Sequence, residues 1–166
     1  MAAHPTPDPI APGQESVWDY PRPPAIRPSD ELIRVVLGGV EICETRTSWR
    51  VLETSHPPTY YLPRSAFVSG SLVPARGSSY CEWKGEAGYL DLVGGEQVAA
   101  RAGWYYPQPN GRYAALRDHV ALYAAAVDYC TVDGERVVPQ PGGFYGGWVT
   151  SSVSGPFKGI PGSTGW

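Results

Sequence analysis

Cysteine is scarce in this sequence, and no two cysteines have the spacing of a metal-ligand pair. The three cysteines, Cys43, Cys81 and Cys130, form an odd number, and none belongs to a Cys-x-x-Cys motif. Disulfide frameworks use even sets of cysteines, and thiolate zinc sites use closely spaced pairs. We therefore expect reduced thiols, with no disulfide framework, no metal and no cofactor.

Long hydrophobic runs and blocks of basic residues are also missing. No apolar stretch approaches the ~18 residues of a membrane span. The first residues show neither the charged nor the apolar region of a secretory signal. The net charge of -3 is spread along the chain, which disfavours nucleic acid as a partner. These absences predict a cytoplasmic protein that binds neither nucleic acid nor membranes.

Aromatic residues are plentiful, with six Trp and eleven Tyr but only three Phe. Trp and Tyr combine a large apolar body with a polar group, so they suit pockets and interfaces as well as cores. At 166 residues the chain is long enough for one domain with a real core. Proline and glycine content divides it into a Pro-rich extended arm (1–28), a β-rich core domain (29–138) and a Gly- and aromatic-rich extension (139–166).

We expect the extension to pack on the core domain or on a second subunit, since so much aromatic surface left in water would need a purpose. The arm, with Trp18 and Tyr20, could likewise cross its own domain or that of a partner in a homodimer.

The core domain has the pattern of antiparallel hairpins, in which β-branched runs flank strong turn signals. The turn signals are Gly38-Gly39, Gly94-Gly95 and Asp133-Gly134. Only one segment has helical spacing, from Tyr113 to Val127, with Asn110 as a candidate cap. Either the helix covers this whole segment, or a short helix near 111–119 ends at Asp118 and residues 120–123 form a strand. Both interpretations give a mainly β, antiparallel protein.

Residues 80–91 predict a central β-hairpin with reactive groups at its turn. If Lys84-Gly85 forms a two-residue turn, Tyr80 faces Tyr89 and Cys81 faces Gly88 on the opposite strand. A glycine in that position would leave open space beside the thiol. A three-residue turn is nearly as compatible with the sequence, because Lys-Gly is less typical of a two-residue turn than Asn-Gly.

Two sets of residues are candidates for function. Cys81 is a candidate nucleophile, because the nearby Lys84 ammonium would favour the thiolate, and Glu86 or His119 could act as acid or base. Candidate ligand-binding residues combine cations that can clamp an anion with aromatic rings that can wall a pocket. They are Arg46, Tyr60, Tyr61, Arg64, Trp83, Trp104 and Tyr105. Each candidate has a structural alternative as a core side chain, a solvated turn residue or a surface ion pair.

Several short segments together carry a family resemblance. They are residues 51–58, 60–64, 81–87, 104–107 and 119–123. The set resembles the bacterial and fungal family of domain of unknown function 427, over roughly residues 31–138. The segments 144–148 and 155–159 are similar to the tails of longer family members.

This resemblance implies a β-tent-like fold, in which small antiparallel sheets meet at an angle around a cleft that takes a small ligand. Zinc on two Cys-x-x-Cys pairs usually holds the apex of such folds, and this chain has neither pair, so the zinc site would be lacking. Fold analogy alone does not assign a function.

Three hypotheses follow. The first is a module whose aromatic and basic cleft binds an anionic or amide-bearing metabolite. The second is a thiol-dependent enzyme, for acyl transfer or redox chemistry, that uses Cys81. The third is a protein-interaction module that uses the aromatic extension.

Overall fold

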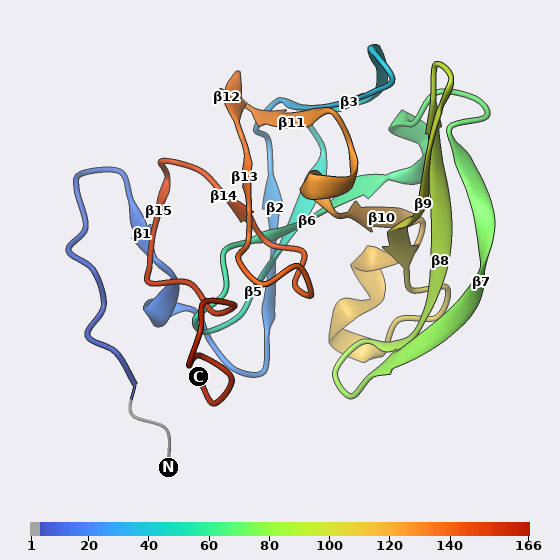
Figure 1. Ribbon diagram of the computed structural model, residues 1–166. Coiled ribbons are helices and arrows are strands. Elements are labelled where there is room, and N and C mark those ends of the chain that lie inside the picture. The colour runs from blue at the N-terminus through green and yellow to red at the C-terminus, as the bar shows by residue number, and fades with distance from the viewer. Residues whose placement is uncertain (1–3) are drawn as a thin grey trace.

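A seven-stranded sheet is the largest element of the computed structural model, which describes residues 4–166 (Figure 1). Its strands in spatial order are β2 (Ala25–Ser29), β5 (Ser48–Leu52), β6 (Thr59–Pro63), β10 (His119–Leu122), β9 (Gln97–Tyr105), β8 (Gly85–Gly94) and β7 (Leu72–Cys81). Every neighbouring pair in this sheet is antiparallel. The prediction of a mainly β, antiparallel single domain is confirmed.

A four-stranded sheet packs against the larger one. Its order is β12 (Glu135–Arg136), β11 (Tyr129–Val132), β3 (Ile33–Leu37) and β4 (Val40–Thr45). The turn between β3 and β4 is the predicted Gly38-Gly39 pair, and both residues have the positive φ, 61° and 74°, that a two-residue hairpin needs. The predicted turn at Asp133-Gly134 likewise joins β11 to β12.

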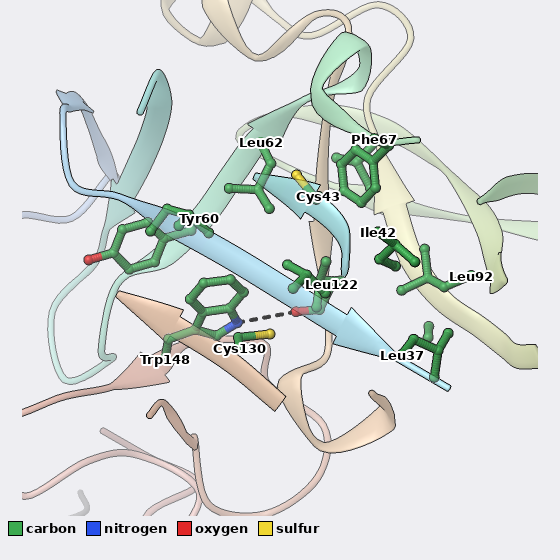
Figure 2. Close-up of a cluster of buried hydrophobic side chains, with 14 of the residues drawn as sticks. Leu37, Ile42, Cys43, Tyr60, Leu62, Phe67, Leu92, Leu122, Cys130 and Trp148 are labelled. Atoms are coloured by element: carbon green, nitrogen blue, oxygen red, sulfur yellow. Dashed lines mark hydrogen bonds between the residues drawn. The ribbon is translucent and has the colours of Figure 1, made fainter. Parts of the chain in front are cut away.

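The main core lies between these two sheets (Figure 2). Ile42 and Cys43 from β4 and Cys130 from β11 meet Leu62 from β6 and Leu92 from β8 there. Successive side chains of a strand point to opposite faces of a sheet, and this alternation puts Ile33, Val35 and Leu37 in the core. Ile42 and Cys43 are both buried because the register of β4 against β3 shifts at this point, as in a β-bulge.

The central hairpin does not have the register that a two-residue turn at Lys84-Gly85 would give. Cys81 pairs with Gly85 and Tyr80 pairs with Glu86, so residues 82–84 form a three-residue loop. The two-residue turn is therefore wrong, and the three-residue alternative is correct. The positive φ of 108° falls on Gly85, directly after the loop. Gly88 makes room for the Tyr105 ring, because a Cβ there would lie 2.7 Å from its Cζ.

The ambiguous segment after Asn110 is not one long helix. A short 3-10 helix, η3 (Gly111–Leu116), is followed by β10 and then by the 3-10 turn η4 (Ala124–Ala126). Asp118 has a positive φ of 60°, which a continuing helix does not allow. β10 then pairs with β6 on one side and β9 on the other, so the strand joins the two halves of the large sheet.

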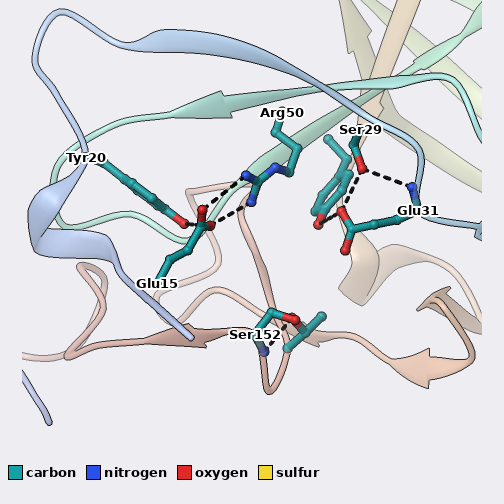
Figure 3. Close-up of polar contacts among 8 residues, drawn as sticks. Glu15, Tyr20, Ser29, Glu31, Arg50 and Ser152 are labelled. Carbon is teal, nitrogen blue, oxygen red and sulfur yellow. Dashed lines mark hydrogen bonds and ion pairs between the residues drawn. The ribbon is translucent and has the colours of Figure 1, made fainter. Parts of the chain in front are cut away.

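The predicted arm is partly incorporated into the sheets, although its residues 1–3 lie outside the described residues. It contains β1 (Glu15–Ser16), the 3-10 turn η1 (Val17–Asp19) and β2, which pairs with β5. The large sheet thus begins at Ala25. The arm is held by Glu15, which accepts hydrogen bonds from Tyr20 Oη and Arg50 Nη1, each at 2.9 Å (Figure 3).

The extension after residue 138 contributes to the core. β13 (Val138–Pro139) pairs with β14 (Trp148–Val149), and β15 (Val153–Ser154) pairs in parallel with β1. Trp148 is only 1% exposed, stacks on Tyr60 and donates its indole N–H to the Leu122 carbonyl (Figure 2). Within residues 4–166, no helix has both the length and the apolar character to cross a membrane.

The other short 3-10 turn, η2 (Arg64–Ala66), follows β6 and leads toward β7.

Candidate functional site

A cavity of ≈ 330 Å³ lies beside the loop that joins β7 to β8. We call it the aromatic cleft, because aromatic side chains make up much of its wall. These are Tyr61, Tyr80, Trp104, Tyr106, Tyr123, Phe144 and Tyr145. The remaining lining includes Glu53, His56, Cys81, Lys84 and Gln140. The wall therefore combines the β5–β6 connection, the central hairpin, the ends of β9 and β10, and the C-terminal extension.

Lys84 places a buried positive charge in the wall of this cleft. It is 9% exposed, and its ammonium lies 5.6 Å from the centre of the Tyr106 ring. Among residues 4–166, no carboxylate lies within ion-pair distance of it. Burial opposes the charge, but the acidic groups of Tyr61, Cys81 and Glu53 outweigh burial and raise the pKa of Lys84.

The loop that carries Lys84 is held from outside by Asn110. The Asn110 backbone N–H donates to the Lys84 carbonyl at 3.0 Å, and its side-chain amide donates to the Trp83 carbonyl at 3.2 Å. Asn110 makes no side-chain cap to η3. Asn110, a candidate helix cap in the sequence, therefore holds the hairpin loop that carries Lys84.

Tyr61 lines the cleft and is almost fully buried. Its oxygen accepts a hydrogen bond from Trp104 Nε1 at 3.2 Å, and its ring lies 6.2 Å from the Tyr106 ring, centre to centre. Burial raises the pKa of Tyr61, and the nearby Lys84 ammonium partly offsets this effect. The phenol is therefore neutral at physiological pH and keeps its proton.

Cys81 is the one cysteine of the three that lines a cavity. It is half-buried beside Lys84, whereas Cys43 and Cys130 lie in the main core at 1% exposure. All three thiols are free. Burial raises the pKa of Cys43 to about 12 and also raises that of Cys130. Cys81 alone is placed to react with a molecule in the cleft.

Glu53, His56 and Gln140 form a polar group in the wall of the cleft. Gln140 Oε1 accepts from the Gly147 N–H at 3.0 Å, so its Nε2 is a donor, and this Nε2 lies 3.0 Å from His56 Nδ1. The neutral ring therefore carries its proton on Nε2, which faces Glu53 Oε2 at 3.7 Å. Burial, the largest effect, lowers the pKa of His56 and agrees with a neutral ring.

The C-terminal extension sits directly on the cleft wall. A Cβ on Gly146 would overlap the Trp104 ring, and a Cβ on Gly147 would lie 2.5 Å from the Pro57 carbonyl oxygen. Glycine at both positions lets the backbone contact these groups without a side chain between them. Trp104 also packs on Tyr123 at 4.7 Å, so the extension and the sheet hold the same indole.

The structure brings together only some of the predicted site residues. Cys81, Lys84, Tyr61 and Trp104 line the aromatic cleft. Arg46 and His119 lie together in a different, more open groove of ≈ 720 Å³. Glu86 is exposed on β8, outside the cleft lining.

The other predicted residues have structural contacts elsewhere. Arg64 stacks over the Tyr105 ring at 4.8 Å, and Tyr60 donates to Glu31 while it packs on Trp148. Trp83 packs partly buried against a smaller core cluster. These residues do not reach the cleft.

Several cleft residues are absent from the sequence-based set. Glu53 and His56 fall in the segment 51–58 that contributes to the family resemblance, so that segment held a signal for them. Tyr106 continues the Trp104-Tyr105 run, and the alternation of a strand would place it with Trp104. Tyr145 falls in the segment 144–148 that is similar to the tails of longer family members, whereas no motif points to Gln140.

The three cysteines do not form a metal site. Among residues 4–166, no group of three or more His, Cys, Asp or Glu side chains is arranged to hold a metal ion. The donor set in this part of the chain therefore does not fit the zinc site that the family resemblance associates with β-tent folds.

Comparison with known proteins adds a family. No curated protein matches the chain. A family model described as "Domain of unknown function (DUF427)" matches residues 25–133, about two thirds of the chain. The match begins at β2 and includes Tyr61, Cys81, Lys84 and Trp104, while Gln140 to Gly146 of the cleft wall lie beyond it. The chain belongs to the family of domain of unknown function 427.

Proposed function

We propose that the protein binds a small organic molecule in the aromatic cleft. The main support is the buried Lys84 ammonium, which lines the cleft. Among residues 4–166, no carboxylate lies close enough to form an ion pair with it. A buried charge without a partner is unfavourable, so such groups usually meet a counterion or a ligand. The cleft volume, ≈ 330 Å³, falls at the lower end of the ~300–1,000 Å³ typical of small-molecule pockets.

The cleft also has the composition of a binding pocket. Aromatic rings form most of its wall, and a few polar groups converge from separate segments, as small-molecule sites require. Arg46 and Arg64, expected to share the anion with Lys84, lie outside it, so the proposal rests on Lys84 alone among the cations. Free thiols at all three cysteines support our further proposal of a cytoplasmic location.

Native mass spectrometry of the gently purified protein tests this proposal. We expect the wild type to retain a small molecule that is released on denaturation and can then be identified. Lys84→Met, which keeps the buried volume but removes the charge, should lose the molecule. Its melting curve, compared with that of the ligand-free wild type, verifies that the variant is folded.

Arg76→Met is the matched control, because it removes a positive charge that is exposed on β7 and lies outside the cleft lining. It should retain the molecule. A bare mass for the wild type in every preparation, together with unchanged behaviour of Lys84→Met, would contradict the proposal.

A thiol-dependent enzyme is the second candidate. The observation in its favour is that Cys81 faces the cleft beside Lys84 while both other thiols are buried in the core. It predicts a thiol at Cys81 that reacts faster than an ordinary cysteine near neutral pH. Against it, the expected acid–base partners Glu86 and His119 lie elsewhere, and both His56 nitrogens are engaged.

The third hypothesis, a protein-interaction module that uses the extension, has less support than the other two. Trp148 is buried, and Phe144 is its one large hydrophobic side chain with strong exposure, at 76%, among residues 139–166.

A further inference from the structure

Tyr61 places a neutral hydroxyl in the wall of the cleft. Its oxygen receives the Trp104 N–H at 3.2 Å, and the residue lines the cavity. A neutral phenol keeps its own proton, so Tyr61 can donate a hydrogen bond while it accepts one. A hydrogen-bond acceptor on a ligand in the cleft can therefore use this donor.

Lys84 adds a positive charge and further donors to the same cavity. Tyr61 and Lys84 both line the cleft, and the Lys84 ammonium lies 5.6 Å from the centre of the Tyr106 ring. An ammonium has three donors and no acceptor, and a neutral phenol also donates. Lys84 and Tyr61 therefore offer the cleft hydrogen-bond donors and one positive charge.

The other polar groups of the lining already have partners. Glu53, the only carboxylate of the lining, forms an ion pair with Arg22 at 3.5 Å and lies 3.7 Å from His56 Nε2. Gln140 uses its oxygen on Gly147 and its amide nitrogen on His56 and on the Lys158 carbonyl. Lys84 is thus the one charge of the lining without an ion-pair partner among residues 4–166.

Flat rings form much of the remaining wall. Trp104 and Tyr123 pack against each other with 4.7 Å between ring centres, and Tyr145 from the extension packs on His56. Aromatic walls favour a planar apolar body, which stacks on them or meets them edge to face.

From these contacts we infer that the ligand is a carboxylate on a planar, apolar body. Its carboxylate is bound by the Lys84 ammonium and the Tyr61 hydroxyl, and its body lies against Trp104, Tyr123 and Tyr145. The inference rests on the proposed function and names the chemical class of its ligand. Amines are disfavoured, because they would bring a second cation beside Lys84.

A series of three probes with one ring system tests this class on the wild-type protein. The probes are naphthalene-2-carboxylate, naphthalene-2-carboxamide and naphthalen-2-ylmethylamine, with affinities from titration calorimetry and ligand-observed NMR. We expect the carboxylate to bind at least about tenfold more tightly than the amide and the amine to bind weakest, because charge-assisted hydrogen bonds are the stronger ones.

Two variants and a control locate the interaction. Lys84→Met should weaken carboxylate binding by about ten- to a hundredfold and leave the amide nearly unchanged. Tyr61→Phe should weaken both probes by a smaller factor, because it removes one donor. Arg76→Met, which removes an exposed charge outside the cleft lining, should change neither affinity. Circular dichroism of each variant verifies that it is folded.

The outcomes separate this inference from the proposed function. Equal affinities for carboxylate and amide, or an unchanged carboxylate affinity in Lys84→Met, would overturn the carboxylate assignment while a binding cleft remained. Failure of the carboxylate probe to bind at low-millimolar concentration would also overturn it. A molecule retained in native mass spectrometry would then still support the proposed function, and its structure would give the correct class.

Discussion

The three cysteines differ in how accessible their thiols are to solvent. Cys43 and Cys130 flank Val35 of β3 on neighbouring strands and are closed off from water in the core. Cys81 ends β7 at the rim of the aromatic cleft. Accessibility is one of the factors that govern thiol reactivity, and it separates Cys81 from the other two.

Alkylation with iodoacetamide near neutral pH should therefore be selective for Cys81. We expect one modification in the native protein, none in Cys81→Ser, and three in denaturant, as read by mass spectrometry. Burial raises the pKa of Cys43 to about 12 and that of Cys130 as well, so their thiolates are scarce.

The rate at Cys81 decides the second candidate function. A rate well above that of a free cysteine would support the thiol-dependent enzyme. An ordinary or slower rate would count against it, and equal slow rates at all three cysteines would also contradict the predicted selectivity.

For the neighbours Tyr60 and Tyr61, the sequence does not tell which side chain faces the cleft. Both were candidate ligand-binding residues, and they are neighbours on β6. One points into the core against Trp148 and the other into the cleft, because adjacent residues of a strand face opposite sides. Which of the two faces is the cleft depends on segments far away in the chain.

At the scale of elements, the attachment of β1 and η1 depends on a charged contact. Glu15 accepts from Arg50 on β5 and from Tyr20 (Figure 3). The hydrogen bond from Arg50 is the largest effect on this carboxyl and holds its pKa below the ordinary value, although burial opposes it. The carboxylate is therefore preferred in the folded protein.

Glu15→Gln should lower the melting temperature at pH 7 by at most a few degrees, because partly exposed ion pairs contribute about 0–1 kcal/mol. The folded pKa is depressed, so the contribution is present above the unfolded carboxyl pKa of about 4.3 and is lost as the pH falls through the folded value. Melting curves should show the difference from wild type shrinking below about pH 4.

Glu96→Gln is the control for this contact, because Glu96 lies exposed in the β8–β9 turn and takes part in none of the ion pairs of residues 4–166. It should leave the melting temperature unchanged. A Glu15→Gln deficit that persisted undiminished in acid would show that packing, not charge, attaches the arm.

For the whole molecule, the extension is part of the folded unit even though the family match ends at residue 133. Trp148 fills the core between the two sheets, and β15 pairs with β1 of the arm. Both ends of the chain are thereby joined to each other and to the core (Figure 1).

Trp148→Ala should destabilise the protein by about 3–5 kcal/mol in urea unfolding, as large core truncations do. That is a large part of the ~5–15 kcal/mol typical of a domain. Deletion of residues 139–166 should cost more and leave a chain without a cooperative transition. Phe144→Ala, in the same extension but 76% exposed, should stay within about 0.5 kcal/mol of wild type. A deletion variant with wild-type stability would contradict this view of the extension.

Local chemistry was enough to predict much of the fold. Gly38-Gly39 and Asp133-Gly134 form the expected turns, because glycine and aspartate tolerate the positive φ that these turns need. The β-branched runs beside them form strands, and their alternation places Ile33, Val35 and Leu37 in the core. The reactive hairpin and the Trp- and Tyr-rich strand ends were likewise visible as candidate pocket residues.

Contacts between distant segments decided the rest. The cleft takes Lys84 from one hairpin, His56 from a loop before β6 and Gln140 from the extension, and no local pattern relates these three residues. Arg46, Arg64 and His119 looked equally suitable in sequence but lie on other surfaces. The sequence by itself determined turns, strands and the chemical groups available. Only the tertiary structure decided which groups share a cavity, because strand order and sheet packing bring together residues that are far apart along the chain.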